Sequence, residues 1–313
     1  MQYFHETIEN WDDWGKVFQS IPAFTPLAEE IFRRHHLPFL PLRHLTPGTN
    51  GVFLSGEYVI KIYAPKESGI EPEQNELPGL AHAGEQGVCC PEITAWGMIH
   101  DRYDFYYLIM KKAEGTEAGT WLKSADYQQK ITFAQTLREQ TQKMNHLPKK
   151  AEAFSNSLFA LFQENHRWND FPRSLQQEIA ALTKAEDEKH NKVFVHGDLT
   201  GENILVTSET QIQIIDFGDC RIAPFWYEWP PLVNELFGWD PLLIQTYFSG
   251  WTEQEFFSTL STAMLCHDFG GDMLKGICDH LHVSYDCIAS RKDTEQLLKR
   301  KLYDKTRKDV HLL

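Results

Sequence analysis

The sequence predicts a bilobal α+β fold, in which a β-rich first lobe is joined by a short hinge to a mostly helical second lobe. Up to about residue 112, short runs of β-branched and aromatic residues alternate with Gly and Asn turns, as in an antiparallel sheet. Most of the remaining chain has helical periodicity, interrupted by one isolated hairpin pattern. With 313 residues, of which 42% are hydrophobic and 24% charged, the chain can bury a substantial core.

The first lobe is predicted at 41–112, after an N-terminal helical leader at 1–40. Aromatic residues and three prolines in the leader indicate two short helices that stop before the first strand. Five strands are expected in the lobe, together with one helix inside EPEQNELPGLAHAGEQG. The strands are LRHL, VFLSG, EYVIKIY, EITAWGMI and FYYLIMK.

The second lobe is predicted at 113–313, after the polar connection KKAEGTEAG. Helical periodicity covers about 121–146, 154–166, 172–189, 225–238, 240–249, 252–270 and 290–308. Residues 193–217 are the exception, because VFVHGD, NILVT and QIQIIDFG are short apolar β runs separated by turn residues. They predict a second, small hairpin among helices.

Charge and composition exclude several classes of function. The formal net charge of −14 repels phosphate backbones, so we expect no nucleic-acid partner. The basic stretch RKDTEQLLKRKLYDKTRK is interleaved with acidic residues and is typical of a solvated terminal helix rather than a nucleic-acid arm. An acidic protein favours a cationic small molecule as partner.

The same sequence predicts a cytoplasmic protein with no membrane partner. No run approaches the ~18 to 20 apolar residues of a membrane helix, and the N-terminus is acidic and aromatic, unlike a signal peptide. The six cysteines contain no C-x-x-C pair, and the vicinal Cys89 and Cys90 are poorly placed for a structural bridge. Reduced thiols are therefore expected.

The strongest chemical signal is the segment HGDLTGENILV, followed by an apolar strand and Asp216-Phe217-Gly218. Phosphoryl transfer needs a carboxylate aligned on the attacking hydroxyl and oxygen ligands that hold a metal ion against the phosphates. Asp198 can be that base, while Asn203 and Asp216 can supply oxygens to magnesium, a hard cation. Each residue alone could merely cap a turn or end a strand, but their joint order favours the catalytic interpretation.

This stretch resembles the aminoglycoside phosphotransferase and choline kinase superfamily, which has H-G-D-x-x-x-x-N where protein kinases have H-R-D. The later segment IAPFWYEWPPLVNELFGWDPLL resembles hygromycin-kinase-like members, and the likeness spans about residues 40–250. It implies a protein-kinase-like fold and Mg²⁺-dependent transfer of the γ-phosphate of ATP or GTP to a hydroxyl of a small molecule. Asp198 would be the catalytic base, His196 would support its loop, and Asn203 and Asp216 would bind the metal.

The resemblance implies further nucleotide contacts. Lys61 in YVIKIY would grip the phosphates after the turn that contains Gly48 and Asn50, and the hinge YYLIMKKAEG would hold the base through backbone groups of Lys111 and Ala113. A helix carboxylate should hold the lysine, and Glu73 matches the family pattern best, with Glu76 as the alternative. The choice between these two glutamates, and between ATP and GTP, stays open at this point.

Two positions depart from the family pattern. KMNHL places Asn145 where a histidine is expected, and Tyr227-Glu228-Trp229 replaces Asp-Leu-Ala, so Glu228 would take over the supporting role of the aspartate. Neither change touches the phosphoryl-transfer residues.

The acceptor is left open between an aminoglycoside or other amino sugar, choline, and a sugar-like metabolite. Asp268 and Asp272, one turn apart on a predicted helix, are candidate contacts to a cationic acceptor, although solvated carboxylates explain them equally well. The cluster around Cys266 and the segment DHLH lack zinc-site spacing. A catalytically silent kinase-like protein is the alternative function, and a protein kinase is disfavoured because no A-P-E-like segment follows Asp216.

Overall fold

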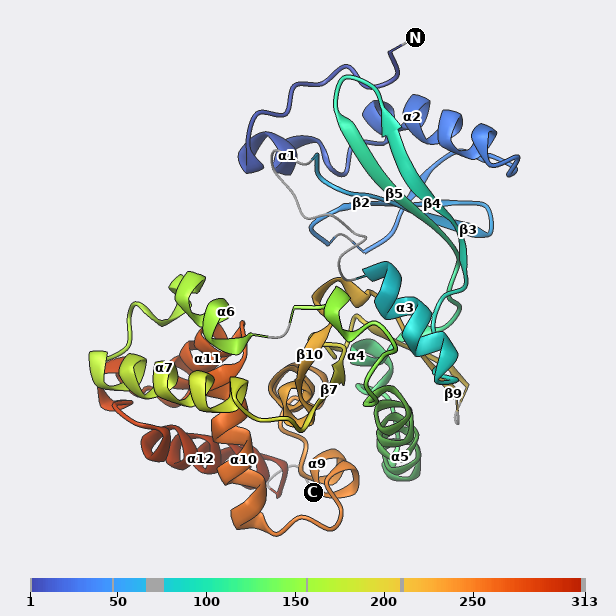
Figure 1. The fold of residues 1–313 in the computed structure, drawn as a ribbon. Coiled ribbons are helices and arrows are strands. Elements are labelled where there is room, and N and C mark those ends of the chain that lie inside the picture. The colour runs from blue at the N-terminus through green and yellow to red at the C-terminus, as the bar shows by residue number, and fades with distance from the viewer. Residues whose placement is uncertain (1, 47, 66–75, 156, 209–210, 311–313) are drawn as a thin grey trace.

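The computed structural model describes residues 2–46, 48–65, 76–155, 157–208 and 211–310, and it has two lobes stacked end to end (Figure 1). The N-lobe is built on one five-stranded antiparallel sheet with the order β1-β2-β3-β5-β4. Its strands are β1 (Arg43–His44), β2 (Gly51–Ser55), β3 (Tyr58–Ile62), β4 (Ile93–His100) and β5 (Asp104–Lys111). All five strands predicted from the sequence are therefore confirmed.

Alternation along β3 gives the N-lobe sheet two different faces. Ile60 and Ile62 are fully buried in an aromatic core, whereas Val59 and Lys61 line the cavity between the lobes. Lys61 sits in the middle of the sheet, opposite Val52 on β2 and Leu108 on β5. A lysine at this position must find its counter-charge inside the protein, because both neighbouring strands shield it from water.

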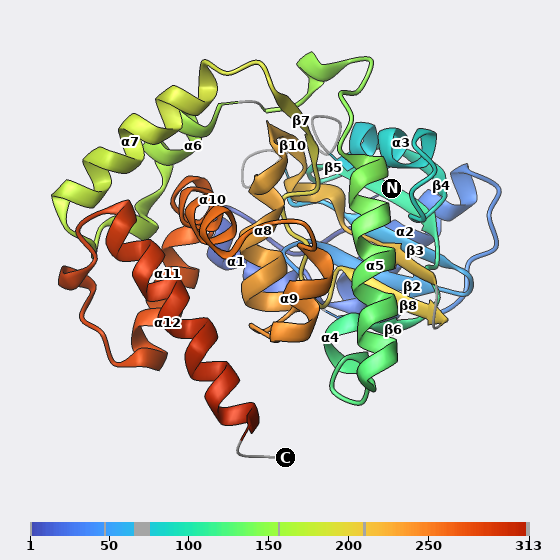
Figure 2. The same cartoon turned by 90° about the horizontal axis from the view of Figure 1, so that it is seen from below.

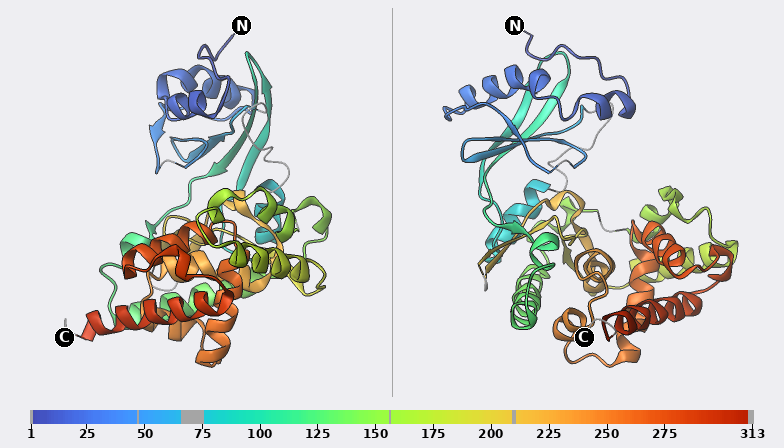
Figure 3. Two further views of the ribbon diagram at one scale, coloured as in Figure 1. Left: turned by 90° about the vertical axis from the view of Figure 1, so that its left-hand side faces the viewer. Right: turned by 180° about the vertical axis from the view of Figure 1, so that it is seen from behind.

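The leader covers the outer face of the N-lobe sheet with α1 (Trp11–Val17) and α2 (Ile21–Arg34), as Figure 3 shows. Ser20 accepts a hydrogen bond from the Ala23 amide and thereby caps α2, whose second residue is a proline. The two helices share the aromatic core with β2 and β5, where the ring of Phe24 packs on Phe53 in a tilted and on Phe105 in an edge-to-face arrangement. The two helices expected in the leader are both present.

Helix α3 (Glu76–Glu85) packs on the C-lobe, beside α5 (Tyr127–Met144) (Figure 2). Its Leu80 and Ala83 belong to the hydrophobic core of the C-lobe. Gly79 makes the close approach possible, since a Cβ atom there would meet Cys220 Sγ at 2.6 Å and Phe217 Cβ at 3.3 Å. The helix therefore presents Glu76 to the N-lobe from the opposite side of the cavity.

The C-lobe is mostly helical, with two small sheets near the cavity. β8 (Ile204–Ser208) and β9 (Gln211–Ile214) form the predicted hairpin, and β6 (Thr116–Glu117) adds a third strand to it. β7 (Lys192–Val195) does not join this hairpin but pairs with β10 (Arg221–Pro224). The sequence analysis missed β10, because four residues that end in proline carry too little of a strand pattern.

The helices of the C-lobe differ in places from the predicted ones. Its longer helices, besides α5, are α7 (Arg173–Asp187), α10 (Glu253–Cys266), α11 (Gly270–Leu281) and α12 (Arg291–Val310). Shorter helical segments are α4 (Ala118–Trp121), η2 (Ala151–Ala153), α6 (Leu158–Glu164), η3 (His166–Trp168), η4 (Phe217–Asp219), η5 (Phe225–Glu228), α8 (Trp229–Pro231), η6 (Leu232–Leu236), α9 (Pro241–Tyr247) and η7 (Tyr285–Cys287). None of the described helices is long and apolar enough to cross a membrane.

The predicted helix at 252–270 extends too far at its C-terminal end, and a second helix, α11, follows it that was not predicted. His267 has extended backbone angles, φ −80° and ψ 144°, and α11 begins only at Gly270. The ring of His267 forms a hydrogen bond with the Gly197 carbonyl, and the regular helix ends at this point. Asp268 therefore precedes α11 and Asp272 lies in its first turn, so the two do not share one continuous helix as expected.

The fit of α3 against the C-lobe predicts opposite effects for two glycines of that helix. Gly79→Ala should lower the free energy of unfolding by about 1–3 kcal/mol, because its methyl group overpacks against Cys220 and Phe217. Gly84→Ala, the matched control, has nothing within 4 Å of its Cβ and should raise stability by about 0.5–1 kcal/mol through helix propensity. Urea unfolding of both variants measures this, and equal effects would refute the packing argument.

Candidate active site

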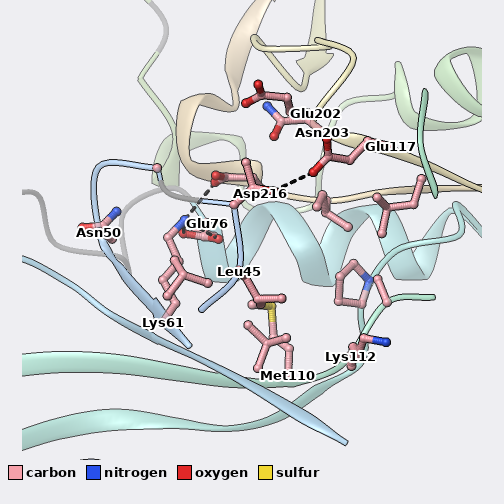
Figure 4. A pocket seen from close by; sticks show the side chains of 18 of the residues that line it. Leu45, Asn50, Lys61, Glu76, Met110, Lys112, Glu117, Glu202, Asn203 and Asp216 are labelled. Carbon is pink, nitrogen blue, oxygen red and sulfur yellow. Dashed lines mark hydrogen bonds and ion pairs between the residues drawn. The ribbon is translucent and has the colours of Figure 1, made fainter. Parts of the chain in front are cut away.

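A cavity of about 320 Å³ opens between the lobes. Lys61, Glu76, Asn203 and Asp216 lie at its polar end, and Figure 4 shows the first two converging with Asp216. Apolar side chains from both lobes form the rest of its wall, among them Leu45, Val52, Val59, Met110, Leu205 and Ile215. The cavity is thus apolar on its walls and charged at one end, as a site for a small molecule with an anionic part would be.

Lys61 is the charged centre of this cavity. Its Nζ lies 2.8 Å from a carboxylate oxygen of Glu76 and 2.8 Å from one of Asp216. The lysine and Glu76 side chains are only 7% and 3% exposed, whereas that of Asp216 is 47% exposed. The three residues come from β3, from α3 and from the end of β9, so these ion pairs join the N-lobe sheet to the C-lobe.

Burial and charge set the protonation of this group. Burial opposes the charged form of Lys61, but Glu76 and Asp216 outweigh it and raise the lysine pKa. Lys61 lowers the pKa of Asp216, so the carboxylate that faces the cavity is ionised. Burial raises the pKa of Glu76 although Lys61 opposes this shift. The lysine cation is therefore essential for keeping a buried glutamate at this position.

The structure decides between the two candidate glutamates. Glu76, the alternative, supplies the carboxylate that holds Lys61, while Glu73 lies outside the described residues. The sequence analysis missed Tyr63, whose hydroxyl donates to Glu76 Oε2 over 2.5 Å and is buried with it. Its position two residues after Lys61, directly after the end of β3, places both side chains on one side, and this spacing could have indicated the pair.

The loop that follows β7 carries the predicted base. Asn203 donates from its side-chain amide to the carboxylate of Asp198 over 2.8 Å and to the Asp198 carbonyl over 2.9 Å. The Asn203 side chain therefore turns its nitrogen to Asp198 and leaves its oxygen for the predicted metal ion. Together with Asp216 it offers two oxygen ligands, a number typical of magnesium sites completed by phosphates and water.

His196 supports the loop from within the core. Its Nε2 lies 3.0 Å from the Ile215 carbonyl, and its Nδ1 accepts the Asp198 amide at 3.2 Å. These partners fix the tautomer with the proton on Nε2. Burial lowers the pKa of His196 to about 4, so the ring is neutral. His196, the predicted supporting residue, thus contacts the backbone of Asp198.

Two further side chains hold the backbone of this loop. The carboxylate of Glu228 accepts the amides of His196 at 2.7 Å and Gly197 at 3.2 Å, and the His267 ring bonds the Gly197 carbonyl at 2.9 Å. Gly197 itself has φ +85°, and a Cβ there would collide with the Asp219 carbonyl, so only glycine fits. Glu228 therefore occupies the supporting position expected for it, and His267 is a residue that sequence reasoning missed.

Asp198 sits in a strongly acidic environment. Burial, followed by repulsion from Asp219 and Asp216, raises the pKa of Asp198 to about 7. A carboxyl with a pKa near neutrality is suited to accept a proton from a hydroxyl group. Asp219 was not predicted, although it directly follows the Asp-Phe-Gly motif. Its effect on the pKa of Asp198 depends on their proximity in the fold, which the sequence does not indicate.

The predicted turn and hinge both line the cavity. Gly48 and Asn50 lie at one side, and Lys111 and Ala113 lie at the other. The Lys111 amide already donates to the Glu92 carbonyl over 2.9 Å, so this residue can contact a base only through its carbonyl. The structure thus brings every described nucleotide-site residue of the sequence analysis to one cavity.

A second cavity of about 430 Å³ adjoins the loop on its other side. Asp198, Asn234, Glu235, Phe269, Asp272 and Met273 line it, with Pro231 and Gly276. The predicted contacts Asp268 and Asp272 are both ion-paired with Arg167, at 3.0 Å and 2.8 Å, and Asp268 is not in this lining. Glu235 was missed, because its exposure on the π-helical turn η6 follows from backbone geometry and not from a sequence pattern.

The family model described as the phosphotransferase enzyme family matches residues 48–265, more than half of the chain. No curated protein matches the chain significantly.

Three solved structures illustrate the likeness in fold. The GDP and kanamycin complex of APH(2″)-IIIa has 15% identity, covers 90% of this chain and 98% of its own, and has a TM-score of 0.55. Amicoumacin kinase hAmiN, in complex with AMP-PNP, Ca²⁺ and amicoumacin, has 14% identity, 89% and 93% coverage, and a TM-score of 0.57. A choline/ethanolamine kinase family protein from Mesorhizobium loti has 15% identity, 88% and 93% coverage, and a TM-score of 0.53. These likenesses concern the protein-kinase-like bilobal fold, which is thereby confirmed.

The charge network at Lys61 predicts a non-additive pair of substitutions. Lys61→Met should lower the free energy of unfolding at pH 7 by about 3 kcal/mol, because it leaves Glu76 buried without a cation. The double variant Lys61→Met/Glu76→Gln should recover part of that loss. Lys149→Met, which breaks only an exposed pair with Glu85, is the control and should change stability by less than ~1 kcal/mol.

The contribution of Asp216 to this loss depends on pH. Lys61 lowers the pKa of Asp216 below its ordinary value of 3.8, so the stabilisation is present above that pH and disappears as pH falls through the lowered pKa. The deficit of Lys61→Met should therefore shrink in acid. A deficit that is constant from pH 7 to pH 3 in urea titrations would contradict the ion-pair account.

Proposed function

The chain belongs to the phosphotransferase enzyme family, and we propose that it transfers the γ-phosphate of ATP or GTP to a hydroxyl group of a small molecule. The observation that carries this proposal is the hydrogen-bonded pair of Asp198 and Asn203, which stands between two cavities. Asn203 lines the cavity between the lobes, and Asp198 lines the second cavity. A donor in the first and an acceptor in the second would meet at this pair.

The first cavity is suited to a nucleotide. Lys61 offers a fixed cation to the phosphates, and apolar side chains from both lobes offer a slot for the base. Asn203 and Asp216 would hold a magnesium ion, which would neutralise phosphate charge when bound. Nucleotide complexes of structurally similar proteins, with GDP and with AMP-PNP and Ca²⁺, support this assignment of the donor.

Asp198 is proposed as the base that accepts the proton of the attacking hydroxyl. Asn203 orients its carboxylate, and the neutral ring of His196 holds its backbone amide. Its raised pKa, about 7, suits a group that must take up a proton near neutral pH. Most of the rate enhancement would come from positioning and charge stabilisation, as is general for phosphoryl transfer.

The second cavity supports a cationic acceptor such as an amino sugar or an amine alcohol. Three carboxylates line it, on Asp198, Glu235 and Asp272. Because Arg167 already neutralises Asp272, Glu235 is the acidic side chain best placed to meet an ammonium group of the acceptor. Similar structures hold kanamycin and amicoumacin, which supports an amine-bearing acceptor.

Nucleotide binding should depend on a divalent metal. The melting temperature should rise with ATP or GTP plus MgCl₂ by more than with nucleotide alone, because the ion offsets repulsion between the phosphates and Asp216. Asp216→Asn should diminish the magnesium-dependent part of the shift. Thermal-shift titration measures this. If neither nucleotide shifted the wild type with the metal, a catalytically silent kinase-like protein would be favoured.

Removal of the base should abolish turnover but not nucleotide binding. Asp198→Asn should reduce kcat by about 10²- to 10⁴-fold on any acceptor found in a screen of aminoglycosides, choline-like amines and sugars. The magnesium-dependent nucleotide shift should persist. Asp279→Asn, an equivalent change on the exposed side of α11, serves as control and should retain activity. Wild-type turnover by Asp198→Asn would show that another group is the base.

A further inference from the structure

The leader contacts the turn Gly48–Gly51 directly, although residues 1–47 lie outside the family match. Trp14, in the middle of α1, donates from its indole Nε1 to the Thr49 carbonyl over 2.8 Å. The side chain is only 1% exposed, and its ring packs on Phe18 and Phe24 at centroid distances of 6.2 Å and 5.9 Å. The donor is thus held rigidly in the aromatic core of the N-lobe by its place on α1, a helix that Figure 1 labels.

A second contact holds the same turn from the same side. Gln19 Nε2 donates to the Asn50 carbonyl over 3.4 Å, so two successive carbonyls of the turn are directed to the leader. The backbone is also in close contact, since a Cβ at Gly51 would lie 3.0 Å from the Phe18 carbonyl. The leader is therefore packed closely against the turn and hydrogen-bonded to it.

Peptide geometry links this support to the cavity. In a trans peptide the carbonyl and the following amide point in opposite directions. The Thr49 carbonyl that faces the leader therefore turns the Asn50 amide away from it, whereas Gly51 is already paired with Ile62 in the sheet. Gly48, Thr49 and Asn50 line the cavity on that side, and backbone amides of such turns are anion-binding groups.

We propose that Trp14 is a positioning residue for the nucleotide: its hydrogen bond to the Thr49 carbonyl orients the Asn50 amide toward the phosphates. This inference rests on the proposed function, because it assigns the polyphosphate of a nucleoside triphosphate to the cavity. It gives the leader a part in phosphate binding, in addition to its part in the aromatic core of the N-lobe.

The test compares direct nucleotide binding by Trp14→Phe and by wild type. Phenylalanine keeps an aromatic ring in the core but leaves the Thr49 carbonyl without its donor. We expect isothermal titration with magnesium and ATP, or GTP, to give a Kd roughly three- to tenfold higher. The kcat at saturating nucleotide should stay within about twofold of wild type, since the reacting groups are untouched.

Phe32→Leu is the matched control, because it removes ring contacts with Phe39 and Tyr58 from the same aromatic core, away from Trp14 and the turn. It should lower the melting temperature and leave the Kd unchanged. Gln19→Ala changes a half-buried side chain outside the core, and it should raise the Kd about twofold without loss of stability. This variant still tests the proposal if Trp14→Phe folds poorly.

The outcomes separate this inference from the proposed function. A wild type that binds nucleotide, with Trp14→Phe and Gln19→Ala binding equally tightly, would overturn the role of the leader alone. Weakening by Phe32→Leu in proportion to its loss of stability would also overturn it. Absence of nucleotide binding by the wild type would contradict the proposed function and this inference with it.

Discussion

The buried ion pairs of Lys61 are the interaction on which the rest of the structure depends. A cation in the middle of a sheet is unfavourable unless carboxylates are supplied inside the protein. Here Glu76 comes from α3, which packs on the C-lobe, and Asp216 comes from the end of β9. The requirement for counter-charge therefore holds the N-lobe sheet at a defined position over the C-lobe and creates the cavity between them.

The catalytic loop depends on a similar principle, with hydrogen bonds in place of ion pairs. Two of its backbone amides donate to the Glu228 carboxylate, and the His267 ring bonds one of its carbonyls. The His196 ring bonds the Ile215 carbonyl, directly after β9. Burial keeps both histidines neutral, with pKa values lowered to about 4 and about 3, so their hydrogen-bond roles do not change near neutral pH. The orientation of Asp198 is thus determined by groups distant from it in the sequence.

Features that depend on short segments were predictable from the sequence. The strands of the N-lobe follow from alternating β-branched residues and turns, and Asp198, Asn203 and Asp216 lie in one motif with defined spacing. Features that depend on contacts between segments were not. Glu73 and Glu76 are three residues apart in the sequence and have the same chemistry, and the approach of α3 to β3 pairs Lys61 with Glu76. Likewise, β10 has a weak pattern of its own and is formed by pairing with β7, and the end of α10 lies where the His267 ring bonds the Gly197 carbonyl.

The sequence by itself therefore determined the fold class, the positions of the N-lobe strands along the chain and the spacing of Asp198, Asn203 and Asp216, because these are encoded by local periodicity and by spacing within short segments. Only the tertiary structure decided which carboxylates near the second cavity are already paired with a cation and which are not neutralised by Arg167. Arg167 neutralises Asp268 and Asp272, while a π-helical turn presents Glu235 to the second cavity. Likewise, it placed Trp14 of the leader on the turn at Thr49. Such assignments depend on distances between residues far apart in the chain, which no local pattern contains.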